Sequence, residues 1–293
     1  MRVAGVGWIV MALGAMAPGT RLAAQAAPPN LLPELPIAVR GAGLGGASTA
    51  MIGYAGSVFT NASGLAPIRV MSLEGALARF SDSSRYFMGA AAVRLGPVNL
   101  GGGLRYLRYD AGGPLQDNME SVLAAVFHRR GISVGLAGDY FAVEDSAGVT
   151  TRTLTSDASV TVAFFDIAAL AFAVQNIGVA PIEGPALAMP GSVRLGFSLN
   201  LIDTYSNGRL LATVDHVWSE NSSRTIFALE GGAVFYGVGL MARIGMGRVP
   251  AASPYASPTY GGSLVLGRGA IDYAYLRRAG EGPLHLFGFR LTP

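Results

Sequence analysis

Short stretches of alternating apolar and polar residues run through most of the chain. In one stretch, positions 193, 195, 197 and 199 hold Val, Leu, Phe and Leu, whereas Arg194, Gly196, Ser198 and Asn200 lie between them. Residues 131–142, 236–247 and 283–292 show the same alternation. A period of two with one apolar face is typical of a strand that is buried on one side. The pattern therefore predicts an all-β protein.

Fourteen stretches of this kind can be marked along the chain. They lie at residues 69–80, 84–95, 98–109, 118–129, 131–142, 152–165, 167–176, 191–201, 209–219, 224–234, 236–247, 259–267, 269–277 and 283–292. The connections between them are of two kinds. Tight turns are expected at Gly96-Pro97, Arg129-Arg130-Gly131 and Gly267-Arg268-Gly269, whereas residues 109–118, 143–151, 176–190 and 248–258 form longer polar connections. Short turns at one end, longer loops at the other and an even strand number are typical of a transmembrane antiparallel β-barrel.

The face opposite the apolar one also favours a barrel over a soluble sandwich. It carries mainly Gly, Ser, Ala and Asn with isolated charges, which is poor material for a water-exposed surface but suits a barrel lumen. Aromatic residues near the strand ends are expected to form girdles at the membrane interfaces. They are Tyr86, Phe87, Tyr106, Tyr109, Tyr140, Phe141, Tyr236, Tyr273 and Tyr275.

Composition supports a membrane location. Hydrophobic residues make up 51% of the 293 residues and charged residues 13%, and the mean hydropathy is +0.42. A water-soluble domain usually has about 25% charged residues. Beyond residue 26, no segment reaches the roughly 18 apolar residues that a transmembrane helix needs. Because backbone groups must be satisfied inside lipid, the prediction is a closed barrel, with an unusually apolar secreted β-protein as the alternative.

Residues 1–26 have the features of a secretory signal peptide. Arg2 gives the positive start, residues 3–16 form a short apolar stretch, and Ala24-Gln25-Ala26 matches a cleavage site. The predicted location is the bacterial outer membrane after removal of this peptide. The 21 basic residues minus Arg2 and Arg21 leave 19 against 18 acidic ones. The mature chain is therefore close to neutral, and its charge does not favour binding of nucleic acid. The absence of cysteine excludes disulfides and thiolate metal sites.

Residues 38–68 fit neither the signal peptide nor the strands. This stretch is built almost wholly from small residues, with no strand alternation and too many glycines for a stable helix. We expect it to fold into a space that the later strands enclose. The predicted organisation is a signal peptide at 1–26, a plug segment in the lumen at 27–68 and a transmembrane barrel at 69–293.

Two short motifs match catalytic or nucleotide-binding patterns but lack the context that those patterns need. Residues 41–46 match G-x-G-x-x-G, yet no βαβ unit follows. Residues 131–135 match G-x-S-x-G, yet Ser133 lies within an alternating strand. A triad of Ser133, His128 and Asp139 is not expected, because alternation places His128 and Ser133 on separate strands with no evident pairing. No catalytic, metal-binding or cofactor-binding residue is predicted, and the protein is expected not to be an enzyme.

Isolated charges of both signs lie on the predicted inward faces. They are Glu74, Arg94, Arg105, Asp139, Asp157, Arg194, Asp215, Glu230, Arg243, Asp272 and Arg290. Charges in a narrow lumen need partners or water. We expect paired networks that join the plug segment to the wall, with Arg40 contributing from the plug, and the alternative is that some of these charges line a polar path.

Several segments together resemble a known family. Residues 40–50, which read R-G-A-G-L-G-G-A-S-T-A, and residues 61–66, which read N-A-S-G-L-A, are similar to the N-terminal signature of the PorV/PorQ group of FadL-like outer-membrane barrels. Residues 174–178, 187–195 and 271–275 match later segments in order. Leu44 stands where the group usually has Met, and Ala62-Ser63 replaces the usual Pro-Ala.

The resemblance implies a fourteen-stranded barrel whose N-terminal segment fills the lumen. The plug residues that it marks are Arg40, Gly41, Gly43, Gly45, Gly46, Asn61, Gly64 and Leu65. The glycines would let backbone pass close to the wall, and Asn61 would brace a turn in the left-handed conformation.

Two functions follow from the resemblance. The favoured one is a PorV/PorQ-type membrane partner in protein secretion, and the alternative is FadL-like uptake of small hydrophobic molecules. The expected partners are outer-membrane lipid and either secreted cargo proteins or small hydrophobic ligands. Uptake would need a kink in the wall, for which the glycines at 101–103 and 231–232 are candidates.

Overall fold

The structure is a computed structural model that describes residues 32, 35, 37–80, 84–108, 115–145, 148–165, 167–184, 187, 189–202, 208–220, 222–247, 255–278 and 282–292. The predicted signal peptide at 1–26 and the girdle candidate Tyr109 lie outside these residues.

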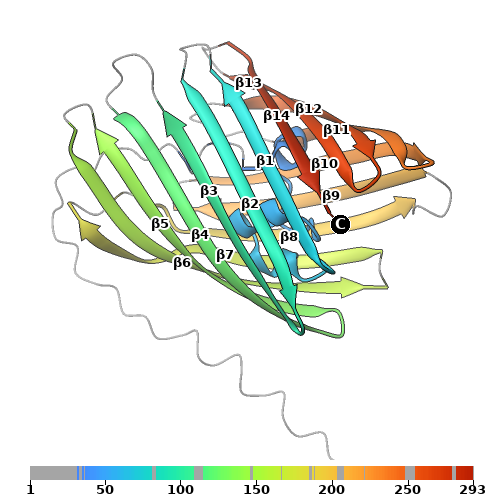
Figure 1. The fold of residues 1–293 in the computed structure, drawn as a ribbon, viewed down its shortest axis with the longest axis horizontal. Helices are drawn as coiled ribbons and strands as arrows, with labels where there is room; N and C mark the ends of the chain where they lie inside the picture. The colour runs from blue at the N-terminus through green and yellow to red at the C-terminus, as the bar shows by residue number, and fades with distance from the viewer. Residues whose placement is uncertain are drawn as a thin grey trace, which may run out of the picture.

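Fourteen antiparallel strands close into a single barrel, as the alternation predicted (Figure 1). Each strand pairs with its neighbours in sequence, and β1 closes the ring against β14, with Leu73 opposite Leu291 and Arg79 opposite His285. The strands are β1 (Met71–Arg79), β2 (Arg85–Leu95), β3 (Val98–Arg108), β4 (Leu115–Arg129), β5 (Ile132–Asp145), β6 (Thr150–Phe164), β7 (Ala168–Glu183), β8 (Ser192–Ile202), β9 (Gly208–Ser219), β10 (Ser222–Phe235), β11 (Val238–Gly247), β12 (Tyr255–Leu266), β13 (Gly269–Arg278) and β14 (Leu284–Leu291).

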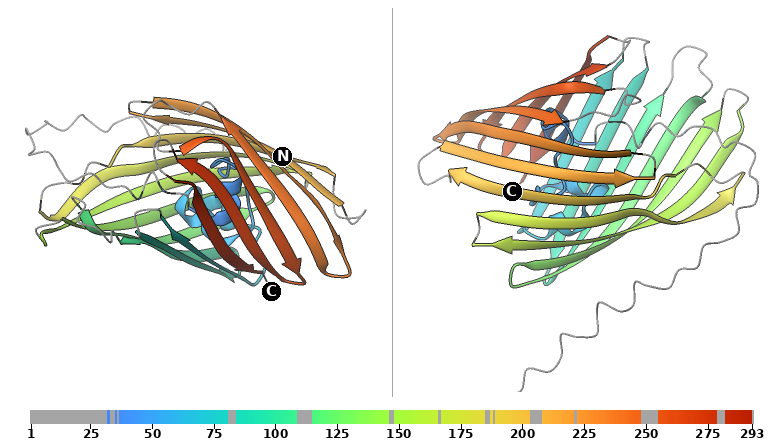
Figure 2. Two further views of the ribbon diagram at one scale, coloured as in Figure 1. Left: turned by 90° about the horizontal axis from the view of Figure 1, so that it is seen from above. Right: turned by 180° about the vertical axis from the view of Figure 1, so that it is seen from behind.

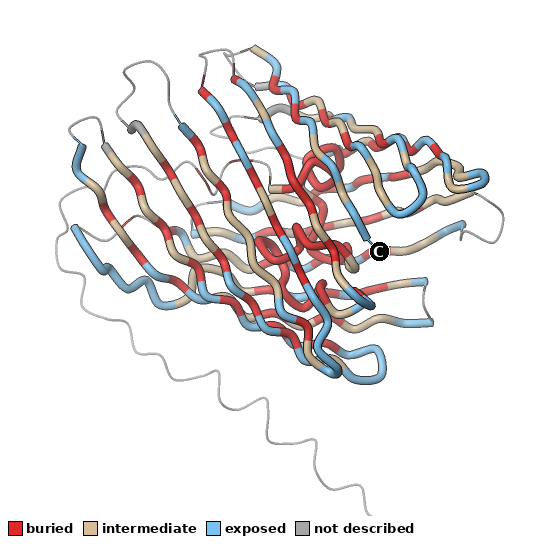
Figure 3. The backbone as a smooth tube through the Cα atoms, in the orientation of Figure 1, coloured by how far each residue is buried: buried red, intermediate tan, exposed pale blue. Residues whose placement is uncertain are grey.

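The outer surface of the barrel is apolar. Leu123 is 76% exposed, Leu240 69% and Leu136 63%, whereas the residues next to them in each strand are buried (Figure 3). A water-soluble protein buries such side chains, so this surface suits lipid. The alternation of faces along the strands is therefore confirmed.

The aromatic girdle was predicted correctly only in part. Phe87 is exposed on the outer face, and Tyr273 and Tyr275 share their face with the exposed Ile271. Tyr86 and Phe141 point inward instead and are 2% and 3% exposed. The prediction failed for these two because each stands beside another aromatic residue, and only one of two adjacent strand residues can face outward.

Residues 37–68 lie inside the ring of strands, and we call them the inner segment (Figure 2). They contain the short helices α1 (Val39–Gly43), η2 (Ala55–Phe59) and η3 (Ala62–Leu65), all of whose residues are buried. Helix α1 contacts β11 to β14, whereas η2 and η3 contact strands between β1 and β6. The inner segment therefore bridges opposite parts of the wall. No helix among the described residues is long and apolar enough to cross a membrane.

The two ends of the barrel differ. At one end, which we call the turn end, β4 joins β5 and β10 joins β11 through two-residue turns. Arg130 and Gly131 have φ of 50° and 80°, and Tyr236 and Gly237 have φ of 51° and 79°. Two successive residues with positive φ are typical of type I′ hairpin turns. The start of β1 and the end of β14 also lie at the turn end, and we call the opposite end the loop end.

The wall is interrupted between β7 and β8. Their pairing begins at Ala168 opposite Leu199 and stops at Gln175 opposite Ser192. The remaining part of β7, up to Glu183, pairs with β6 only and has three register shifts within that pairing. Asn176 and Gly178 have φ of 59° and 67°, which disrupts the regular ladder. At 101–103 and 231–232, by contrast, pairing is continuous on both sides, so the predicted glycine kinks are absent there.

Candidate functional site

The inner segment approaches the wall most closely at glycines. The Cα atom of Gly261 on β12 would lie only 2.9 Å from a Cβ atom added to Gly43. A Cβ atom on Gly245 of β11 would overlap the carbonyl group of Leu44. Gly45 has a φ of 67°, a left-handed conformation that favours glycine, directly after α1. Backbone packs directly on backbone here, which only glycine permits.

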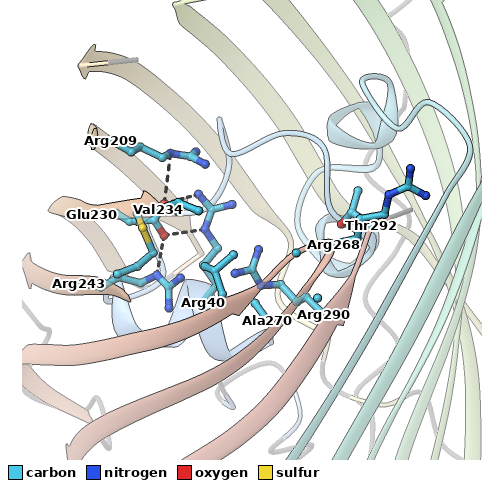
Figure 4. Close-up of a pocket in the computed structure, with 13 residues that line it drawn as sticks. Arg40, Arg209, Glu230, Val234, Arg243, Arg268, Ala270, Arg290 and Thr292 are labelled. Atoms are coloured by element: carbon cyan, nitrogen blue, oxygen red, sulfur yellow. Dashed lines mark hydrogen bonds and ion pairs between the residues drawn. The ribbon is translucent and has the colours of Figure 1, made fainter. Parts of the chain in front are cut away.

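Arg40 on α1 is buried at the centre of an ionic network with the wall (Figure 4). Its Nε and Nη2 atoms donate to the two carboxylate oxygens of Glu230 on β10 at 2.8 and 2.6 Å. Arg243 on β11 donates to the same carboxylate at 2.5 Å and to Asp272 on β13 at 3.2 Å. Arg290 on β14 completes the chain by donating twice to Asp272.

The geometry keeps Arg40 charged. Burial acts to lower the pKa of the guanidinium, but the adjoining Glu230 carboxylate more than offsets this, so the net pKa is raised. A two-point contact between a guanidinium and a carboxylate is also directional, because both groups are planar. The network therefore fixes the orientation of α1 as well as its position.

A second contact between the inner segment and the wall is centred on Asp215 of β9, which is fully buried. One carboxylate oxygen accepts from the backbone N–H groups of Ser48 and Thr49 at 2.9 and 2.8 Å. Arg194 on β8 donates to the Thr49 hydroxyl at 2.9 Å and to the Gly46 carbonyl at 3.1 Å. These bonds satisfy backbone groups of residues 46–49, which lie outside the short helices of the inner segment.

Asn61 holds the inner segment by its side chain, not by a left-handed turn as expected. Its φ is −157°, which is extended backbone. Its Nδ2 group donates to the Thr49 carbonyl at 2.7 Å and to the Thr161 hydroxyl on β6 at 2.9 Å. Ser63 donates to the Asn61 carbonyl oxygen at 2.5 Å. The amide therefore joins two parts of the inner segment to the wall.

The remaining marked residues of the inner segment make backbone contacts. The carbonyl of Gly41 accepts from the N–H groups of Leu44 and Gly46, and the carbonyl of Gly64 accepts from Gly53. The Leu65 carbonyl accepts from the side chain of Asn99 on β3 at 2.6 Å. Glu74 on β1 accepts from the Gly56 N–H group at 2.8 Å. The inward-facing polar groups thus serve mainly to bind backbone of the inner segment.

Another group of inward charges lies on β3 to β6. Arg105 pairs with Glu120 and donates to the Leu32 carbonyl at 3.0 Å. Asp157 accepts from the side chain of Gln175 and the N–H group of Asn176 at 3.0 and 2.8 Å. Asp139 is buried, and one of its carboxylate oxygens has no hydrogen-bond partner among the described residues.

Sequence reasoning missed Glu120, although the alternation that marked Asp139 on β5 also holds for β4. Glu120 stands at an even position between the inward-facing Asn118 and Val122. Arg94 has the inward register of Ala92, but it lies at the end of β2 and is exposed, where its Nε donates to the Gly96 carbonyl. Arg94 therefore reaches solvent at the turn end and does not join the networks above.

The triad proposed and rejected from the sequence is not assembled, but one reason for rejecting it was wrong. His128 and Ser133 lie directly opposite each other on β4 and β5. Asp139 is six positions further along β5, roughly 20 Å away at ~3.4 Å per residue, and Ser133 donates to the Thr161 carbonyl at 3.4 Å. Without the third group in reach, His128 and Ser133 do not form a triad.

A small apolar cluster lies beside the interruption in the wall. Phe141 and Val143 of β5 pack with Leu187 and Met189, which belong to the connection between β7 and β8. The Leu187 N–H group lies 3.3 Å from the hydroxyl of Thr153 on β6, to which it donates. Asn176 donates to the Pro190 carbonyl at 3.0 Å. The connection therefore folds inward next to the part of β7 that β8 leaves unpaired.

Comparison with known proteins gives structural matches. The Ralstonia pickettii toluene transporter TbuX has a TM-score of 0.62 at 12% identity, over 87% of this chain and 98% of that chain. The Pseudomonas putida toluene transporter TodX has a TM-score of 0.53 at 11% identity, over 86% of this chain and 97% of that chain. A Pseudomonas aeruginosa FadL homologue has a TM-score of 0.53 at 11% identity, over 92% and 99%.

No family model and no curated protein sequence matches the chain. At 11–12% identity the structural matches establish the fold. They agree with the FadL-like part of the resemblance found in the sequence, whereas nothing in them bears on the PorV/PorQ group in particular. The chain shares the barrel fold of these three structures.

Proposed function

We propose that this protein is a non-enzymatic barrel of the bacterial outer membrane that lets small hydrophobic molecules cross that membrane. The apolar outer face supports a position in lipid. The shared fold with two toluene transporters and a FadL homologue supports transport of hydrophobic molecules. The turn end would face the periplasm, since short periplasmic turns and longer outer loops are usual in such barrels.

The observation that carries the proposal is the interrupted pairing between β7 and β8. The inner segment is buried and held by ionic and backbone contacts, so a straight path through the lumen is obstructed. A molecule that enters at the loop end would instead meet the apolar cluster of Phe141, Val143, Leu187 and Met189. From there it would leave sideways past the unpaired part of β7 into the membrane.

The exposed side chains on this part of β7 fit such a path. Val179 and Ile182 are 37% and 55% exposed, and the alternation of buried and exposed residues ends after Ala173. A hydrophobic solute leaving here would pass from the apolar cluster to the exposed apolar side chains of β7. Displacement of Leu187 and Met189 from Phe141 and Val143 would open the route.

A role as a secretion partner, which the sequence favoured, has less support. The compared structures whose fold matches are described as transporters of toluene or as a FadL homologue. Docking of a secreted protein would require large loops, and the chain's connections are modest in length. Uptake is therefore the better supported of the two functions.

A disulfide that fixes the connection to the wall tests the proposal. The chain has no cysteine, so a Thr153→Cys, Leu187→Cys pair would be the sole thiol pair in the protein. Uptake of radiolabelled toluene would be measured in cells that lack their own transporter and express the wild type or the variant. We expect uptake with the wild type, a several-fold loss in the oxidised variant and recovery on reduction.

Two controls make the result specific. Each single-cysteine variant should transport as the reduced double variant does, because neither can form the disulfide. Equal uptake by the oxidised and reduced double variant, once the disulfide is shown to have formed, would exclude the lateral route. Toluene uptake no higher than in cells without the protein would exclude the function itself.

A further inference from the structure

A cavity of about 190 Å³ opens at the turn end of the barrel, below the network around Arg40 (Figure 4). Strands β9 to β14 form its wall, and the turn from Gly267 to Gly269 lies at its rim. The interruption between β7 and β8 is in another part of the wall. The cavity is therefore separate from the proposed path for hydrophobic molecules.

Guanidinium groups dominate the lining. Arg40, Arg209, Arg243 and Arg290 line the cavity, and Arg268 stands at its rim. The carboxylates in contact with these arginines, among the described residues, are Glu230 and Asp272. Glu230 lines the cavity and Asp272 lies behind it, so two negative charges are paired with four positive ones.

A third carboxylate, that of Glu74, lies nearby but binds the inner segment. Glu74 stands opposite Arg290 in the pairing of β1 and β14. Its carboxylate accepts from the Gly56 N–H group, and it does not line the cavity. Even if Glu74 is counted, the four interior arginines outnumber the three carboxylates, and Arg268 adds a further cation at the rim.

The arginines differ in how fully their donors are used. Arg243 bonds Glu230, Asp272, Ser263 and the Gly262 carbonyl. Arg209 lies 3.6 Å from the Glu230 carboxylate, beyond hydrogen-bond length, and its side chain is 40% exposed. Arg290 donates through Nε and Nη2 to Asp272 and is 19% exposed. Since a guanidinium has five N–H donors, Arg209 and Arg290 have donors that no other described residue occupies.

We propose that this cavity binds a small oxyanion, a carboxylate or phosphate group, between the guanidinium groups of Arg209, Arg290 and Arg40 that line it. Arginine matches this chemistry because its planar fork pairs with two oxygens of a carboxylate or phosphate. The size of the cavity admits a free ion or the anionic head of a larger molecule whose body stays outside. This inference does not depend on hydrocarbon uptake.

Binding would be measured by isothermal titration calorimetry on the full mature protein in a neutral detergent at low ionic strength. The probes are inorganic phosphate, acetate and short-chain phosphatidylglycerol. We expect saturable binding of phosphate or acetate in the millimolar range or tighter. Phosphatidylglycerol binding well above that of phosphate would identify a lipid headgroup as the source, whereas the reverse would identify a free ion; either supports the site.

Two variants separate specific binding in this cavity from diffuse electrostatic attraction. Arg209→Gln should weaken phosphate or acetate binding by about tenfold, the effect of losing one charge-assisted hydrogen bond. Arg224→Gln is the control, because Arg224 is an inward arginine on β10, the strand of Glu230, but lies six positions from Glu230 toward the loop end, about 20 Å away. It should leave binding unchanged.

The proposal is overturned by either of two results. One is the absence of saturable binding of all three probes to the wild type. The other is an equal loss in Arg209→Gln and Arg224→Gln, which would indicate diffuse electrostatic attraction. Because toluene uptake is not measured here, failure of this proposal and failure of the transport function remain distinguishable.

Discussion

At the scale of single residues, the Glu230 carboxylate joins the inner segment to the wall through contacts with three arginines. Its two oxygens accept from Arg40 and Arg243, and Arg209 approaches one of them. Both Arg40 and Arg243 are buried, so water compensates their charges only poorly if this carboxylate is lost. Removing one partner of a buried ion pair is costly because it leaves an uncompensated charge.

We therefore predict that Glu230→Gln destabilises the protein by about 3–5 kcal/mol. A folded barrel migrates differently on a gel from the heat-unfolded chain. The temperature at which the folded band disappears would measure the change in stability. Glu183→Gln is the matched control: Glu183 pairs with Arg152, but their side chains are 53% and 43% exposed. An exposed pair contributes only about 0–1 kcal/mol. Similar shifts in the two variants would contradict the role given to Glu230.

At the scale of elements, the fit between α1 and β11–β12 depends on close backbone contact. Gly43 meets Gly261, and the Leu44 carbonyl lies against Gly245. These contacts, not side-chain packing, determine how near α1 can come to the wall. Any side chain on Gly245 must push the inner segment away, whereas the hydrogen bonds of β11 to β10 and β12 need not change.

Gly245→Ala should accordingly displace the inner segment while leaving the barrel folded. We expect a several-fold rise in cleavage of the inner segment by added protease, with unchanged heat-modified mobility. Gly138→Ala on β5 is the control, because no atom lies within 4 Å of a Cβ added there. Equal protection of the inner segment in both variants would show that the close approach at Gly245 is unimportant.

The strands could be predicted from the sequence because each face of a barrel wall meets one environment. Lipid on one side and small or polar groups on the other impose a period of two, and residues such as those at 236–247 record it directly. The period of two failed to mark a strand where its faces no longer meet two distinct environments. The prediction ended the seventh strand at residue 176, but β7 continues to Glu183 beyond a bulge at Asn176, where the alternation is lost.

The partners of the inward charges could not be predicted. Alternation places Glu230, Asp272 and Arg290 on the inner face, but period alone does not say which strands lie close across the lumen. Arg40 and Glu230 are 190 positions apart, and their contact depends on the path of the inner segment. The interruption after Gln175 was missed for a related reason, since the glycines at 101–103 were a stronger local signal than a single Asn176.

At the scale of the whole molecule, the wall and the inner segment are separable. The ring of fourteen strands closes through the pairing of β1 with β14, and none of its ladder bonds involves residues 37–68. The wall should therefore close without the inner segment. The carboxylates that now bind the inner segment, Glu74, Asp215 and Glu230, would then face water in an open lumen, where an unpaired charge costs little.

Deletion of residues 38–68 should consequently give a folded barrel with an open, water-filled lumen. In planar bilayers we expect steady ion conductance from the deletion variant and little from the full-length protein. The inward faces carry charges of both signs, including Arg105, Asp139, Arg194 and Asp272, so the channel should favour neither cations nor anions strongly. A deletion variant that keeps heat-modified mobility but does not conduct would show that something other than the inner segment closes the lumen.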